Sequence, residues 1–129
     1  MIKAIIFDFF GVLEQNGEPN QALLDFIRDE LKPKYKIGLV SNSSGAGLKR
    51  LLGEDLKLFD DVVISEEVRL YKPEPEIYEL AAQRLGAKPA KCLYVDNHGY
   101  RVAGAEATGM PGLVYKGFSQ LKNELEKLT

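Results

Sequence analysis

Short apolar runs alternate with longer amphipathic stretches along the chain. Almost wholly apolar runs predict strands buried on both faces, and they lie at about 3–8, 36–40, 62–65, 91–95 and 112–115. The stretches that follow them predict helices with one apolar side, at about 20–31, 45–53, 75–86, 99–108 and 117–128. This alternation favours a parallel sheet with helices on both faces. We therefore predict an α/β fold with a doubly wound, Rossmann-like, five-stranded parallel sheet.

A single carboxylate ends the first apolar run. Ala4 to Phe7 are apolar, Asp8 follows directly, and Gly11 allows a turn soon afterwards. In open α/β sheets, ligands bind just outside the carboxyl ends of the strands, where Asp8 is expected to lie. The alternative is an Asp that only ends the strand and caps the next segment. This segment alone leaves both interpretations open.

Polar residues also follow three other predicted strands. Ser41 and Asn42 come after the second apolar run, Lys72 after the third, and Asp96 ends the fourth. Because the carboxyl ends of parallel strands meet at one edge of a sheet, these side chains and Asp8 can converge. Each has an ordinary interpretation as well: a Ser/Asn turn, a solvated lysine, or a helix cap.

Four segments resemble, in order, the motifs of the haloacid dehalogenase superfamily. They are Asp8 to Leu13, Ser41-Asn42, Lys72-Pro73-Glu74-Pro75-Glu76-Ile77-Tyr78 and Tyr94-Val95-Asp96-Asn97. The resemblance extends from Ile2 to about Tyr115 and implies that the first strand is central. Most members of this superfamily are Mg²⁺-dependent phosphatases. Four ordered motifs are specific for the fold and less specific for the substrate.

The resemblance implies a catalytic role for Asp8 and a bound Mg²⁺. Asp8 would attack phosphorus and form an aspartyl-phosphate, which divides one difficult step into two. The implied metal ligands are the Asp8 carboxylate, the backbone carbonyl of Phe10, and Asp96. Oxygen ligands of this kind suit Mg²⁺.

The remaining motif residues are implied to handle the charge of the phosphoryl group. Lys72 would neutralise both the nucleophile and the transferring group. Ser41 would donate a hydrogen bond to a phosphoryl oxygen, together with the backbone N–H groups of Asn42 and Ser43. The helix that starts near Gly45 would add a favourable dipole.

Two positions depart from the usual phosphatase pattern. Phosphatases of the superfamily normally carry a second Asp where this chain has Phe10, and that Asp acts as general acid and base. Its loss is expected to slow turnover by roughly 10²–10⁴-fold. Asn97 replaces a second acidic residue found in many members, which predicts weaker metal binding. His98, the only histidine, is either a substitute acid or base or an ordinary loop residue.

The intervals between the motifs leave no room for a cap domain. Members of the superfamily commonly insert one between the first and second, or second and third, motifs. Here each interval holds about one helix and one strand, and residues 14–20 are expected to form a short polar loop. The resemblance to capless members implies a bulky phosphorylated substrate, or an oligomer in which a neighbour covers the site.

Composition limits the remaining possibilities. The length of 129 residues is typical of a single domain, 1–129, and 45% hydrophobic residues suffice for a core. A net charge of −2 does not favour nucleic-acid binding. Cys92 is the only cysteine and is expected to be an inert core thiol. With no signal peptide or membrane-spanning run recognised, we expect a cytoplasmic protein without membrane partners.

Three functions therefore compete. The first is a slow or specialised Mg²⁺-dependent phosphohydrolase that uses Asp8. The second is a binding or regulatory domain that keeps the fold and metal site but has lost efficient hydrolysis through Phe10. The third is a dehalogenase, which we rank lowest because dehalogenases of the superfamily need a cap and no Mg²⁺. The sequence does not name the substrate or the oligomeric state.

Overall fold

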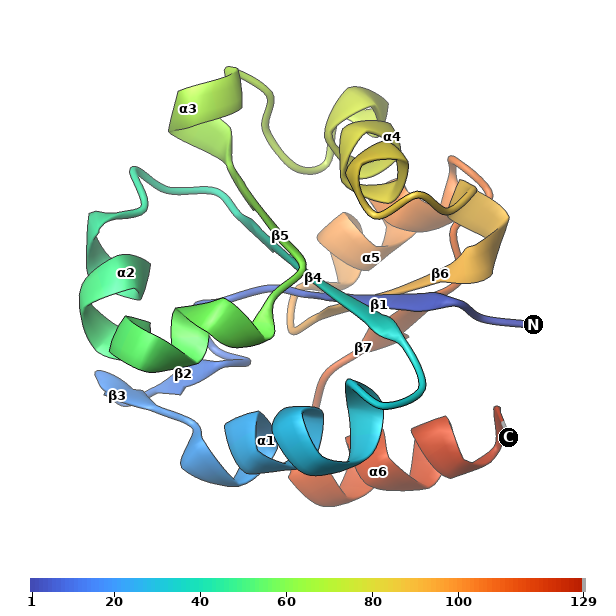
Figure 1. The fold of residues 1–129 in the computed structure, drawn as a ribbon. Coiled ribbons are helices and arrows are strands. Elements are labelled where there is room, and N and C mark those ends of the chain that lie inside the picture. Colours follow the sequence, from blue (N-terminus) through green and yellow to red (C-terminus); the bar gives the residue numbers. More distant parts are fainter. Residues whose placement is uncertain (129) are drawn as a thin grey trace.

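The structure is a computed structural model that describes residues 1–128. Within them a parallel sheet has the strand order β5-β4-β1-β6-β7 (Figure 1). Its strands are β1 (Ala4–Phe7), β4 (Lys36–Ser41), β5 (Asp61–Ile64), β6 (Cys92–Asp96) and β7 (Gly112–Val114). β1 is central, flanked by β4 and β6. The predicted five-stranded parallel sheet and its central first strand are confirmed.

The register of the sheet brings the strand ends together. Phe7 of β1 is paired with Leu39 of β4 and with Val95 of β6. Asp8 and Asp96, which follow Phe7 and Val95, therefore leave neighbouring strands at the same level. The carboxyl edge of the sheet is thus the edge that carries polar groups.

The helices lie on both faces of the sheet, as predicted (Figure 1). They are α1 (Gln21–Phe26), α2 (Ala46–Leu52), α3 (Ser65–Val68), α4 (Pro75–Arg84), α5 (Gly99–Glu106) and α6 (Phe118–Glu126). α1 continues into a π-helical turn, Ile27–Leu31, and 3₁₀ turns occupy Gly53–Leu58 and Pro89–Lys91. The single helical turn α3 was not predicted, because four residues are too few to show a helical period.

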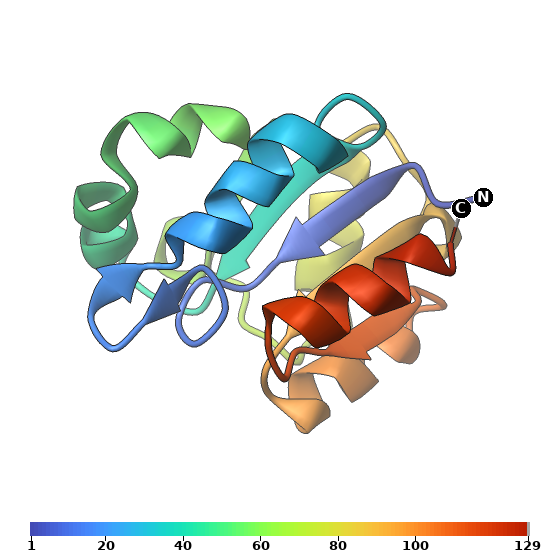
Figure 2. The same cartoon turned by 90° about the horizontal axis from the view of Figure 1, so that it is seen from below.

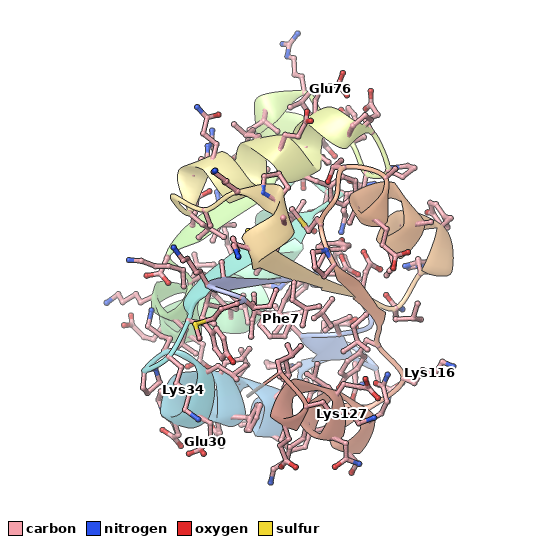
Figure 3. The ribbon with its side chains drawn as sticks, turned by 90° about the vertical axis from the view of Figure 1, so that its right-hand side faces the viewer. Phe7, Glu30, Lys34, Glu76, Lys116 and Lys127 are labelled. Carbon is pink, nitrogen blue, oxygen red and sulfur yellow. The ribbon has the colours of Figure 1, made fainter. Side chains whose placement is uncertain are left out.

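Alternate side chains of β1 feed two hydrophobic cores. Ile5 and Phe7 belong to the core beneath α1 and α6, and Ala4 and Ile6 to the core beneath α4 and α5. Figure 2 shows α1 and α6 side by side on one face of the sheet. The centroids of the Phe26 and Phe118 rings lie 5.3 Å apart there. Phe7 lies in the interior in Figure 3, whereas the labelled lysines and glutamates lie at the periphery.

A small hairpin takes the place of the expected polar loop. β2 (Glu14–Gln15) and β3 (Glu18–Pro19) pair antiparallel across Asn16 and Gly17, both with positive φ. Residues 1–128 contain no separate cap domain. None of the helices in this part of the chain combines the length and the apolar character needed to cross a bilayer.

Candidate functional site

A completely buried ammonium group lies at the carboxyl edge of the sheet. Lys72 Nζ donates to Asp8 Oδ1 at 2.7 Å and lies 3.2 Å from Asp96 Oδ2. It also contacts the Val40 carbonyl at 2.8 Å and the Tyr94 hydroxyl at 2.7 Å. The Lys72 side chain is 0% exposed. One cation therefore joins β1, β4 and β6 at their carboxyl ends.

Asn42 fixes the backbone that carries this lysine. Its side chain accepts from the Lys72 N–H at 2.9 Å and donates to the Lys72 carbonyl at 3.0 Å. On the other side, Gly104 of α5 allows the segment to approach closely, since a Cβ on Gly104 would lie 2.7 Å from Pro73 Cβ. The Lys72 side chain thus enters the site from a loop held at both sides.

Each of the two buried carboxylates faces in two directions. Asp8 Oδ1 and Asp96 Oδ2 face the Lys72 ammonium. Asp8 Oδ2 and Asp96 Oδ1 both lie 3.2 Å from the inner end of the Asn97 amide, and the Phe10 carbonyl oxygen lies 3.3 Å from it. With its nitrogen inward, the two N–H bonds of this amide point at the three oxygens, and His98 Nδ1 lies 3.1 Å from the same nitrogen. The three atoms predicted to bind Mg²⁺ therefore converge on one point.

This set of oxygens fits a hard cation. Two carboxylate oxygens and one carbonyl oxygen converge around the inner end of the Asn97 amide. Oxygen ligands of this kind suit Mg²⁺. His98 Nδ1 is close as well, since ligand atoms of Asp8, Asp96 and His98 lie within 4.8 Å of one another. Because Mg²⁺ prefers oxygen to nitrogen, the Phe10 carbonyl suits the ion better than the imidazole.

The surroundings shift the pKa values of Asp8 and Asp96 in opposite directions. Burial raises the pKa of Asp8, and the neighbouring Lys72 charge only partly offsets this. Burial acts in the same direction on Asp96, but Lys72 and the hydrogen bond from Tyr94 outweigh it, so the pKa of Asp96 is lowered. Burial also raises the pKa of Tyr94, which keeps its hydroxyl protonated as a donor to Asp96. Asp96 therefore holds its negative charge more firmly than Asp8.

The predicted phosphate-binding residues lie at the end of β4. Ser41 is fully buried, and its hydroxyl is 2.9 Å from that of Ser43. Ser43 Oγ also accepts from the Gly45 N–H at 3.2 Å. The Asn42 side chain is engaged with Lys72, and the role predicted for Asn42 in phosphate binding concerns its backbone N–H alone.

Phe10 exposes its ring and turns its carbonyl inward. The side chain is 45% exposed and packs edge to face on Phe9, with ring centroids 4.8 Å apart. Gly11 follows with φ +84°, and a Cβ there would lie 2.3 Å from the outer end of the Asn97 amide. Glycine is thus required where the turn after β1 meets the Asn97 amide.

His98 lies at the rim of the site. Its backbone N–H donates to Asp96 Oδ1 at 2.9 Å, and its Nδ1 is 3.2 Å from the same oxygen. Arg101 Nη1 lies 3.5 Å from His98 Nδ1. Sequence reasoning missed Tyr94 and Arg101. The i, i+2 spacing of Tyr94 and Asp96 on one strand face was the available signal for Tyr94.

Comparison with known proteins places the chain among hydrolases. A sequence model of haloacid dehalogenase-like hydrolases matches residues 21–109, which include Ser41, Lys72 and Asp96 but begin after Asp8. Fructose-1-phosphate phosphatase YqaB of Escherichia coli (strain K12) is 26% identical over 107 residues, covering 72% of this chain and 57% of the relative. The chain thus spans less than two thirds of that relative.

Solved structures of similar size share the fold. An uncharacterized protein from Corynebacterium glutamicum ATCC 13032 Kitasato has a TM-score of 0.86 and 27% identity, covering 99% of this chain and 95% of that one. A HAD family enzyme from Bacteroides thetaiotaomicron, in complex with magnesium and inorganic phosphate, has a TM-score of 0.79 and 16% identity. That match covers 94% of this chain and 99% of the other, and it concerns the fold alone.

Proposed function

The chain belongs to the haloacid dehalogenase-like hydrolase family, and on this basis we propose Mg²⁺-dependent phosphatase chemistry through an aspartyl-phosphate on Asp8. One observation carries the proposal. The carboxylates of Asp8 and Asp96 each turn one oxygen to a buried ammonium and the other to the point where the Phe10 carbonyl also converges. That point is the position proposed for the metal ion.

Asp8, Asp96 and the Phe10 carbonyl would hold Mg²⁺. When bound, the ion would offset the negative charge that the nucleophile and the phosphoryl group bring together. Asn97 either withdraws or turns its amide oxygen toward the ion, because its inner end lies within 3.3 Å of the three ligand atoms. We infer that this adjustment weakens the binding of metal.

Asp8 Oδ1 is the proposed nucleophile, since Oδ2 faces the metal position. As Oδ1 bonds to phosphorus, the bond from phosphorus to the ester oxygen breaks, and its electron pair leaves with that oxygen. Lys72 Nζ, 2.7 Å from Oδ1, is placed to neutralise the charge around the transferring group. The Ser41 hydroxyl and the N–H groups of Asn42 and Ser43 are proposed to bind phosphoryl oxygens.

Phe10 makes both steps slow in this proposal. The leaving oxygen needs a proton unless it is a weak base, and the Phe10 side chain has none to give. In the second step, water attacks phosphorus, the bond from phosphorus to Asp8 breaks, and a proton must leave the water. Phe10 cannot accept it. We therefore infer a loss of roughly 10²–10⁴-fold relative to a site with an acid and base.

A phosphate ester with a bulky leaving group fits the open rim of the site. Two exposed aromatic side chains adjoin the proposed site. The Phe10 carbonyl oxygen is one of the proposed metal ligands, and the Tyr100 ring centroid lies 5.7 Å from that of His98. Phe10 and Tyr100 are 45% and 56% exposed. No cap covers them in this part of the chain, so the leaving group can extend outward.

Hydrolysis of p-nitrophenyl phosphate tests the proposal, because its leaving group needs no proton. We expect slow turnover with Mg²⁺, none with EDTA, and none for Asp8→Asn. Phe10→Asp should turn over faster, since a carboxylate at this half-exposed position remains solvated. Phe10→Asn is the matched control, which has the same shape without an acid or base, and it should stay slow. Unchanged turnover in Asp8→Asn would exclude Asp8 as the nucleophile.

Phe10 also favours one alternative, a binding or regulatory domain that keeps the fold and metal site. This alternative predicts that inorganic phosphate binds to the native chain in the presence of Mg²⁺, as measured by calorimetry. It also predicts that neither the native chain nor Phe10→Asp hydrolyses any phosphate ester. Faster turnover of Phe10→Asp would rule against it.

A further inference from the structure

Arg101 carries a positive charge at the rim of the site that no carboxylate neutralises directly. It lies in the first turn of α5, and the Tyr78 hydroxyl donates to its backbone carbonyl at 2.6 Å. Within residues 1–128 its guanidinium forms no ion pair. By contrast, Arg28 pairs with Asp25 and Asp29. The backbone of Arg101 is therefore anchored, while its charge is left for another group.

Two neighbouring side chains hold the guanidinium in place. Arg101 Nε donates to the Tyr100 hydroxyl at 3.1 Å, and the guanidinium lies 5.5 Å from the centre of the Tyr100 ring. Nη1 lies 3.5 Å from His98 Nδ1. The Nη2 group has no hydrogen-bond partner among residues 1–128, so a ligand can use its two donors.

His98 connects this guanidinium to the carboxylates of the site. Its Nδ1 lies 3.2 Å from Asp96 Oδ1 and 3.5 Å from Arg101 Nη1. Burial acts to lower the pKa of Arg101, but the charges of Asp96 and Asp8 outweigh it and raise the pKa. The rim is open, since Tyr100 is 56% exposed and the His98 side chain 42%. The charge of Arg101 therefore acts on the two carboxylates at which the phosphoryl group is proposed to bind.

We propose that Arg101, positioned by Tyr100, forms a second anion-binding subsite that selects phosphate esters whose leaving group carries a further anionic group. A guanidinium fork matches a carboxylate or a second phosphate through two parallel hydrogen bonds. The phosphoryl group occupies the Asp8 site and the second anion meets Nη1 and Nη2 of Arg101. This inference rests on the proposed phosphoryl site at Asp8 and names the substrate class of that site.

Three probes with a common three-carbon skeleton test the subsite. Glycerol 3-phosphate, 3-phosphoglycerate and glycerol 1,3-bisphosphate end in a neutral hydroxyl, a carboxylate and a second phosphate. Their binding is measured by calorimetry with Mg²⁺ in the Asp8→Asn background, where turnover cannot interfere. We expect the two probes that carry a second anionic group to bind about tenfold more tightly than glycerol 3-phosphate, which corresponds to about 1.4 kcal/mol. The tighter of the two shows which anion the subsite prefers.

Variants assign the preference to Arg101. Arg101→Gln should remove it and leave the affinity for glycerol 3-phosphate within about twofold, whereas Arg101→Lys should restore part of it. Tyr100→Phe removes the hydroxyl that orients Nε and should reduce the preference without abolishing it. Arg50→Gln is the matched control, because Arg50 also has no ion-pair partner in the described chain but lies in the last turn of α2. It should change nothing.

The possible outcomes separate the subsite from the underlying function. Equal binding of all three probes by the parent, or an equal loss for all three in Arg101→Gln, overturns the subsite while leaving the phosphoryl site intact. If none of the probes binds and inorganic phosphate does not bind to the native chain with Mg²⁺ either, the proposed function fails and the subsite fails with it.

Discussion

Replacing Lys72 by methionine should destabilise the protein more than any other single lysine substitution at an ion pair. Methionine keeps the length of the side chain and removes the ammonium. The two carboxylates of Asp8 and Asp96, 2.7 and 3.2 Å from Nζ, then face each other without their cation. The Val40 carbonyl also loses its 2.8 Å donor.

The cost follows from the burial of both partners. Breaking a buried ion pair from one side costs about 3–5 kcal/mol, because a charge is left uncompensated. Two carboxylates share Lys72, so we expect the upper half of that range near pH 7. Lys49→Met is the matched control. Its bridge to Glu67 has the same 3.2 Å length as that to Asp96, but both side chains are about half exposed. Its loss should cost less than about 1 kcal/mol.

The stability lost in Lys72→Met should depend on pH in a definite direction. Burial already raises the pKa of Asp8, and the Lys72 charge opposes that rise. Without Lys72 the folded-state pKa of Asp8 moves further above its unfolded value, so the folded state binds the extra proton. Stability of the variant is then lost as pH rises through that folded-state pKa. The deficit of Lys72→Met should therefore shrink on going from about pH 7 to about pH 5.

Urea denaturation in EDTA, followed by circular dichroism, measures these differences for the native chain and both variants. Added Mg²⁺ should restore part of the loss in Lys72→Met, since an ion that binds only the folded state stabilises it. A deficit for Lys72→Met no larger than that of Lys49→Met, or one that is the same at both pH values, would refute the reasoning.

Three further predictions concern two positions in the site and one at the start of β6. Asn97→Asp should raise Mg²⁺ affinity by about tenfold or more in calorimetry, and unchanged affinity would show that residue 97 does not adjoin the ion. Gly11→Ala should lower the free energy of unfolding by about 1–3 kcal/mol, because φ is +84° and the new Cβ would meet Asn97 at 2.3 Å. Burial raises the pKa of the Cys92 thiol to about 11, so a thiol reagent near neutral pH should label Cys92 only as the protein unfolds. Rapid labelling of the folded chain would contradict this.

The sequence sufficed for the sheet because its signals are local. β1 and β6 are nearly unbroken apolar runs, and each ends in an aspartate that stops the run. Parallel pairing then places Asp8 beside Asp96, and only the register of the structure was needed to show it. The burial of Cys92 followed from the same pattern and is confirmed.

The hairpin after β1 was predictable but missed. Asn16-Gly17 is the dipeptide that favours a tight turn between two strands, since both residues tolerate positive φ. Their φ values are 56° and 82°. The flanking strands have only two residues each and no apolar alternation, so the turn was the only available signal.

Other features of the site depend on contacts between distant segments. The Asn42 clamp on Lys72 joins residues 30 positions apart, and no local pattern indicates it. The place of the Asn97 amide among three oxygens depends on the absence of a Cβ at Gly11. The orientation of the Arg101 guanidinium depends on its hydrogen bond to Tyr100, the preceding residue. Because adjacent exposed residues of these types are common, the sequence does not indicate this contact.

Rapid acid quenching followed by mass spectrometry tests the central claim most directly. The native chain is mixed with p-nitrophenyl phosphate and Mg²⁺, stopped after short intervals, and digested to locate any phosphoryl group. The account predicts one phosphoryl group on Asp8, dependent on Mg²⁺, absent in Asp8→Asn, and less abundant in Phe10→Asp because that variant regains a base for the second step. Hydrolysis that proceeds with no phosphoryl group on Asp8 at any interval, or that persists in Asp8→Asn, would contradict it.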